Sequence, residues 1–153
     1  MTVVTMILFQ DRSRLRWLYL VIALSLGFYG LKGGLWVLRS GGIHNVLGPE
    51  DTFFGDNNTL GLALSMALPL LLTLARDEPR RWLAWLLRAI FAGSVIAILF
   101  TYSRGAFLSL ATVMAMMAWR SPWRLRFITA AVAALLIAAP FIPAHWWERV
   151  ASI

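Results

Sequence analysis

The sequence contains no cysteine. This absence excludes a disulfide framework, a thiolate zinc site and a cysteine nucleophile. Charged residues make up only 14% of the 153 residues, and the histidines are His44 and His145. These histidines and the scattered carboxylates give no metal-ligand spacing, and no glycine-rich nucleotide loop, nucleophile elbow or paired-carboxylate motif occurs. We therefore expect no metal ion and no cofactor, and the catalytic residues remain unassigned.

Apolar residues, in contrast, make up 60% of the chain and are concentrated in long runs. A soluble domain of this size could not cover so much apolar surface, whereas long apolar runs are typical of membrane spans. The sequence therefore predicts an all-α, polytopic transmembrane helix bundle without a soluble core. The net charge of +7 comes mainly from arginines between the runs. Such clusters indicate membrane topology, so we expect the lipid bilayer as a partner and no nucleic acid.

The apolar runs predict about five spans, since a bilayer core about 30 Å thick needs about 20 helical residues. The predicted spans are 17–37, 59–75, 82–102, 105–119 and 127–143. A single helix over 82–119 would be about 57 Å long, which is too long for one crossing. We therefore predict a tight turn at Ser103-Arg104-Gly105, in which the glycine supplies a positive φ.

Arginines cluster on every second connection between the predicted spans. The clusters are Arg12, Arg14 and Arg16, then Arg76, Arg80 and Arg81, then Arg120, Arg124 and Arg126. The positive-inside rule assigns them to the cytoplasmic face. The chain then divides into a cytoplasmic amino-terminal segment (1–16), a transmembrane bundle (17–143) with an outward loop at 39–58, and the start of a second outward loop (144–153). We expect the chain to be a fragment of a larger membrane protein.

Arg104 is the most prominent polar residue, because apolar runs flank it on both sides. An arginine held at membrane depth costs on the order of 2.5 kcal/mol. Its guanidinium could bind an anion such as a phosphate or a pyrophosphate. It could equally extend to the phosphates of the outer lipid leaflet. The sequence leaves both interpretations open.

Two further polar features lie on the outward side. Lys32 follows Gly30 within the outer half of the first span. It is either a second cation facing a central cavity or a lysine that extends to the lipid headgroups. Asp56-Asn57-Asn58 precedes the second span. These residues are either ordinary helix caps or a polar cluster at a helix amino terminus, where backbone N–H groups also favour anions.

Three segments together resemble the O-antigen ligase and polymerase superfamily. They are Tyr29-Gly30-Leu31-Lys32-Gly33-Gly34, the loop from Gly48-Pro49 through Phe53-Phe54 to Asp56-Asn57-Asn58, and Thr101-Tyr102-Ser103-Arg104-Gly105-Ala106. The nearest branch is the O-glycosylation ligase associated with exosortase systems. Trp147-Glu148-Arg149 resembles the start of the family's large periplasmic loop. The resemblance covers nearly the whole chain, which would form the middle part of a family member.

This resemblance implies an inverting, metal-independent glycosyltransferase of the bacterial inner membrane with a periplasmic active face. Its donor is a glycan on undecaprenyl pyrophosphate, and its acceptor is a hydroxyl on lipid A core, a growing glycan or a protein. Arg104, in the Ser103-Arg104 element, matches the arginine expected to hold the donor pyrophosphate. Asn58 and Asp56 match polar residues that line the same cavity, and Lys32 is a weaker match. The family's proposed catalytic histidine lies beyond residue 153, so activity of this chain alone stays uncertain.

Two other classes of function remain open. A small transporter or channel subunit for an anionic solute would also suit intramembrane arginine and lysine in glycine-interrupted helices. A transporter should show inverted repeats, and we find none in the sequence. A structural membrane subunit would use the same polar residues only for packing, and replacing Arg104 would then leave glycan assembly unchanged.

Overall fold

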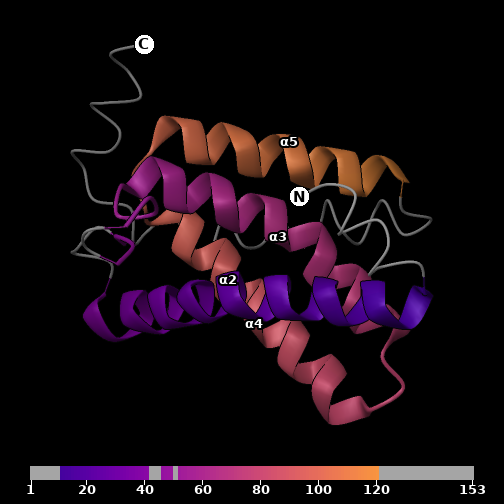
Figure 1. The fold of residues 1–153 in the computed structure, drawn as a ribbon. Coiled ribbons are helices and arrows are strands. Elements are labelled where there is room, and N and C mark those ends of the chain that lie inside the picture. The colour runs from indigo at the N-terminus through magenta and orange to yellow at the C-terminus, as the bar shows by residue number, and fades with distance from the viewer. Residues whose placement is uncertain (1–10, 42–45, 50–51, 121–153) are drawn as a thin grey trace.

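The computed structural model describes residues 11–41, 46–49 and 52–120 as an all-helical assembly without strands in these ranges. Its helices are α2 (Arg12–Ser40), α3 (Asn57–Asp77), α4 (Arg81–Leu99) and α5 (Arg104–Arg120) (Figure 1). By length and composition, α2, α3 and α4 can each cross a membrane, and α5 is apolar but shorter. The predicted all-α class is thus confirmed for the described residues. The predicted fifth span at 127–143, both histidines and segment 144–153 lie outside them.

Successive helices alternate in direction, so α2 runs parallel to α4 and α3 runs parallel to α5 (Figure 1). α3 and α4 each contact all the other described helices, and α3 makes most of the contacts with α5. The end of the bundle at which α2 begins and α3 connects to α4 is called the arginine end below. The opposite end, at which α3 and α5 begin, is called the motif end. Each end is held together by its own polar contacts.

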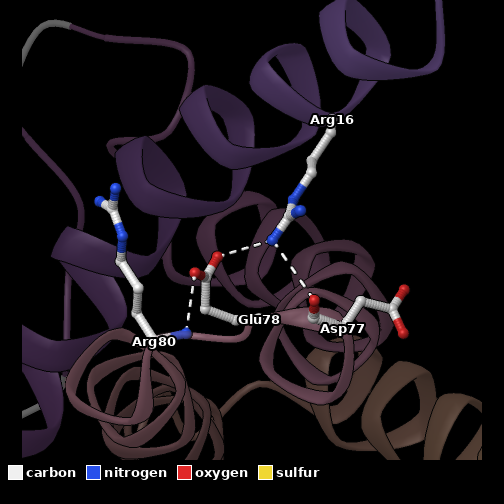
Figure 2. Close-up of polar contacts among 4 residues, drawn as sticks. All are labelled: Arg16, Asp77, Glu78 and Arg80. Carbon is white, nitrogen blue, oxygen red and sulfur yellow. Dashed lines mark hydrogen bonds and ion pairs between the residues drawn. The ribbon is translucent and has the colours of Figure 1, made fainter.

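At the arginine end, Arg16 joins α2 to the connection between α3 and α4. Its guanidinium donates to the Glu78 carboxylate at 2.7 Å and to the Asp77 carbonyl at 3.4 Å. The other carboxylate oxygen of Glu78 accepts a hydrogen bond from the backbone N–H of Arg80 at 3.3 Å (Figure 2). The Glu78 side chain is only 8% exposed, so these donors replace the water that its charge has lost. The arginines in the first turns of α2 and those around the α3–α4 connection therefore lie at one end of the bundle.

The packing of α2 on α4 depends on small residues. A Cβ atom added at Gly34 would lie 2.5 Å from the Gly93 carbonyl oxygen and 2.8 Å from the Gly93 Cα. The backbones therefore approach so closely that no side chain fits between them, as in small-residue contacts of membrane helices. One turn earlier, Gly30 packs directly against Ser94. The Ser94 hydroxyl is fully buried and donates to the Ile90 carbonyl at 2.8 Å.

Leucines of α3 form the centre of the apolar core. Leu60, Leu64, Leu68 and Leu71 are fully buried at helical spacing. The outer surface of the bundle is also rich in apolar side chains, among them Trp17, Met66 and Leu108, which are all about 70% exposed. A soluble monomer rarely exposes large apolar areas, whereas a bilayer solvates them. This distribution fits helices that lie in lipid.

Candidate functional site

The turn between α4 and α5 lies earlier in the chain than the sequence predicts. α4 ends at Leu99 and α5 begins at Arg104, so Arg104 and Gly105 are helical and the connection is 100–103. The residue with positive φ is Tyr102, at 52°, and not Gly105. The prediction that glycine supplies the left-handed residue of this turn is therefore wrong.

Ser103 explains this shift, because it caps α5. Its carbonyl accepts the first helical hydrogen bond from the Phe107 N–H at 3.0 Å, and its hydroxyl oxygen accepts from the Ala106 N–H at 3.3 Å. A serine in this position favours the start of a helix directly after it. The chain must then reverse before Ser103, and the left-handed conformation falls on Tyr102.

Gly105 is required for a different reason, namely the close approach of α3. A Cβ atom added at Gly105 would lie 2.5 Å from the Asn58 side-chain oxygen. The same oxygen accepts a hydrogen bond from the Ser103 hydroxyl at 2.9 Å. The glycine thus leaves room for the Asn58 carboxamide beside the first turn of α5.

Asp56 caps α3. One of its carboxylate oxygens accepts hydrogen bonds from the backbone N–H groups of Asn58 at 3.0 Å and Thr59 at 3.2 Å, and the Thr59 hydroxyl contacts the same oxygen. This is the ordinary capping role that the sequence allows. The carboxylate is occupied by the helix terminus, and its negative charge compensates the positive end of the helix.

Asn57 and Asn58 join the start of α3 to the α4–α5 connection. The Asn57 amide donates to the Thr101 carbonyl at 2.9 Å across 44 residues, and the Ser103–Asn58 hydrogen bond spans 45 residues. The structure therefore brings Asn58 and Ser103, both predicted as site residues, into direct contact. Asn57 was not selected from the sequence as a binding residue, although it stands within the same Asp-Asn-Asn run.

Small residues hold α3 and α5 together below this contact. Gly61 packs directly against Ala106, and the hydroxyls of Ser65 and Ser109 lie 2.9 Å apart in a hydrogen bond. Because the two helices are parallel, their amino termini lie side by side at the motif end (Figure 1). The amino terminus of α5 carries a partial positive charge of about half an elementary charge, whereas Asp56 compensates that of α3. The motif end is therefore electrostatically suited to an anion.

Arg104 adds a full positive charge at this place. It is the first residue of α5, and it is exposed. Its neighbour Gly105 meets Asn58, so Arg104 stands directly beside the α3–α5 contact. Tyr102 lies in the connection between the helices, and burial raises the pKa of its phenol. The phenol is therefore neutral at physiological pH and adds no negative charge to the site.

Lys32 is placed elsewhere, on an exposed part of α2. It lines a groove between α2 and residues 46–49, with a cavity volume of about 840 Å³. The segment 46–49 is held by a hydrogen bond from the Val46 N–H to the Phe100 carbonyl at 3.1 Å. The structure thus brings Asp56, Asn58, Ser103 and Arg104 together around the starts of α3 and α5, whereas Lys32 lines a separate groove on α2.

Among residues 11–41, 46–49 and 52–120, no group of acidic and histidine side chains could hold a metal ion. Comparison of the chain with models of known protein families, with curated proteins and with solved structures finds no match. The geometry of the motif end and the motifs themselves are therefore the basis for a functional proposal.

Proposed function

We propose that this chain is part of a membrane glycosyltransferase of the O-antigen ligase type, which transfers a glycan from undecaprenyl pyrophosphate to a hydroxyl acceptor. The observation that carries the proposal is the hydrogen bond between Ser103 and Asn58. It unites two of the motifs that resemble this superfamily. These motifs are far apart in the sequence, yet they form one polar site.

The chemistry of the site suits the pyrophosphate of such a donor. When the glycosidic bond to the donor breaks, negative charge builds up on the pyrophosphate leaving group. A guanidinium forms short, charge-assisted hydrogen bonds with phosphate oxygens, and donors fixed in advance stabilise developing charge most effectively. Arg104 supplies the guanidinium in this proposal, and the amino terminus of α5 adds partial positive charge, whereas Asp56 compensates the amino terminus of α3.

Asn58 supplies a second donor in this proposal. Its side-chain oxygen accepts from Ser103, which leaves its NH₂ group on the other side of the carboxamide. That NH₂ group has no hydrogen-bond partner among the described residues. It is therefore available for an oxygen of the ligand. Asp56 contributes by starting α3, and not by contacting the donor.

The membrane orientation completes the proposal. Under the positive-inside rule, the arginine end faces the cytoplasm and the motif end faces the periplasm of a bacterial inner membrane. The resemblance assigns the deprotonation of the acceptor to a histidine beyond residue 153. The described helices then bind the donor, and other parts of the enzyme act on the acceptor.

Replacement of Arg104 tests the proposal. In the complete protein, we expect Arg104→Ala and Arg104→Lys to abolish glycan transfer and to leave membrane insertion intact, because lysine cannot reproduce the two-pronged contact of a guanidinium with phosphate. Transfer is measured as consumption of the undecaprenyl pyrophosphate-linked glycan. Arg88→Ala is the matched control, since Arg88 is an exposed arginine of α4 whose guanidinium lies over Trp85.

Normal transfer in both Arg104 variants would exclude the pyrophosphate role. If these variants transferred glycan normally but lost transport of an anionic solute, the site would belong to a transporter or channel. Equal loss in the Arg88 variant would show a general effect of removing arginine from an apolar helix.

A further inference from the structure

The groove beside Lys32 combines basic and apolar side chains in the way that a lipid-binding site does. It lies between the exposed side of α2 and residues 46–49. Gly30 and Gly34 mark the opposite side of α2, which packs against α4. The groove therefore opens on the outside of the described bundle.

Two cations line this groove. Lys32 and Arg39 are both exposed, and they stand seven residues apart on α2, which is about two turns or about 10 Å along the helix. Neither has a hydrogen-bond or ion-pair partner among the described residues. Among the described residues that line the groove there is no aspartate or glutamate. Two long basic side chains at this spacing can hold one anionic group between them.

The rest of the groove is apolar and aromatic. Phe28, Tyr29, Leu35 and Trp36 contribute from α2, and Leu47 and Pro49 contribute from the facing segment. Phe28 and Trp36 are more than half exposed. A free inorganic anion would use the two cations but not this surface, whereas an acyl chain would cover it. The ligand therefore needs an anionic group joined to an apolar part.

We infer that this groove binds an acidic glycerophospholipid, with its phosphate between Lys32 and Arg39 and an acyl chain along Phe28 and Trp36. Lys32 lies within the apolar stretch of α2 that can cross a membrane. A lysine there without a counter-ion is costly, and a lipid phosphate provides one. The tryptophan fits this assignment, because tryptophan prefers the level of the lipid headgroups.

Lys32 is the only lysine of the chain, which permits a direct test. The purified full chain is reconstituted in vesicles of phosphatidylcholine, with or without phosphatidylglycerol, and treated with a membrane-permeant amine reagent. Peptide mapping separates Lys32 from the amino-terminal amine, which serves as the internal reference. We expect phosphatidylglycerol to reduce the relative labelling of Lys32 about fivefold. The attraction between one basic residue and an anionic lipid surface is about 1 kcal/mol, which corresponds to this factor.

Two variants distinguish a site from a general charge effect. Arg39→Gln should restore most of the labelling in phosphatidylglycerol vesicles, and Arg88→Gln should leave the protection unchanged. Equal labelling in both kinds of vesicle, or equal restoration by both variants, would overturn the inference.

Other occupants give different results in phosphatidylcholine vesicles. Protection there by a polyprenyl pyrophosphate, without protection by phosphatidylglycerol, would assign the groove to an isoprenoid lipid and overturn the inference. Protection there by inorganic phosphate would assign it to a free anion, with the same consequence. The inference does not depend on the proposed glycosyltransferase function, so the Arg104 variants should keep the protection of Lys32.

Discussion

The Ser103 hydroxyl donates a hydrogen bond to the Asn58 side-chain oxygen at 2.9 Å, across 45 residues of sequence. The same hydroxyl oxygen accepts from the Ala106 N–H and so caps α5. One small side chain therefore both starts a helix and orients a carboxamide on a neighbouring helix. This dual role explains how Arg104, the next residue, comes to lie beside Asn58.

The orientation of Asn58 leads to the first prediction. Asn58→Asp keeps an oxygen that can accept from Ser103, but it replaces the outward NH₂ group with a negatively charged oxygen. If the site holds pyrophosphate, we expect donor turnover to fall at least about tenfold, which corresponds to about 1.4 kcal/mol. The thermal stability in detergent should stay close to that of the wild type.

The control for this variant is Asp56→Asn. Asparagine is as good an amino-terminal cap as aspartate, so α3 should remain intact. Removing this negative charge should leave donor turnover equal to that of the wild type or higher. Unchanged turnover in Asn58→Asp would contradict a ligand contact at Asn58.

Gly105 provides a second prediction, about packing. In Gly105→Ala, the new methyl group would lie 2.5 Å from the Asn58 oxygen, so the first turns of α3 and α5 must separate. We expect a loss of about 1–3 kcal/mol, the usual cost of overpacking. The loss is measured as a fall in the denaturation midpoint in detergent, with Ala115→Ser at an exposed position of α5 as the control. Equal midpoints for the two variants would show that this contact is not tight in solution.

Arg16 provides a third prediction, at the other end of the bundle. Arg16→Gln leaves the Glu78 carboxylate buried with only the Arg80 N–H as a donor. We expect a loss of about 1–2 kcal/mol, less than for a fully buried pair because the Arg16 side chain is 41% exposed. Arg81→Gln, an exposed position at the same end, should cost less than about 0.5 kcal/mol.

Glu78→Gln in the Arg16→Gln background separates two contributions to this loss of stability. One is the loss of the Arg16 contacts, and the other is the cost of leaving the buried Glu78 charge unpaired. The double variant should recover stability, because no buried charge remains without its partner. If the double variant were no more stable than Arg16→Gln alone, the loss would not come from an unpaired Glu78 charge but from the lost contacts of Arg16 itself.

Membrane orientation gives a fourth prediction. A reporter enzyme that is active only in the periplasm should be active when fused after Asn57, at the motif end, and inactive when fused after Glu78, at the arginine end. The reverse pattern would place the proposed donor site in the cytoplasm. Equal activity at both positions would exclude a helix that crosses the membrane between them.

The long apolar runs of the sequence predict α2, α3 and α4 well, since a chain in lipid must satisfy its backbone hydrogen bonds within each span. The α4–α5 turn was misplaced for a local reason. Glycine readily adopts a positive φ, which favours a turn at Gly105. The capping by Ser103, however, determines where α5 begins, and the positive φ falls on Tyr102. A capping serine just before a helical run is a signal that could have located the turn.

The contacts between distant segments could not be predicted from the sequence. Asn57 reaches the Thr101 carbonyl only because α3 and α4 pack at one particular axial position relative to each other. The hydrophobic periodicity of the sequence does not determine this position. The position of Lys32 escaped prediction for a related reason. α2 carries glycines on one side and aromatic residues on the other, and only its packing against α4 shows which side faces outward.

The contact of Gly34 with Gly93 also has a consequence for biogenesis. The first described helix makes its backbone-to-backbone contact with the third one in chain order, and not with its immediate neighbour. During synthesis, α2 is complete before Gly93 has been made. The glycine side of α2 can therefore reach its partner on α4 only afterwards. Assembly of the bundle is for this reason a late event, completed only after the polypeptide has passed residue 93.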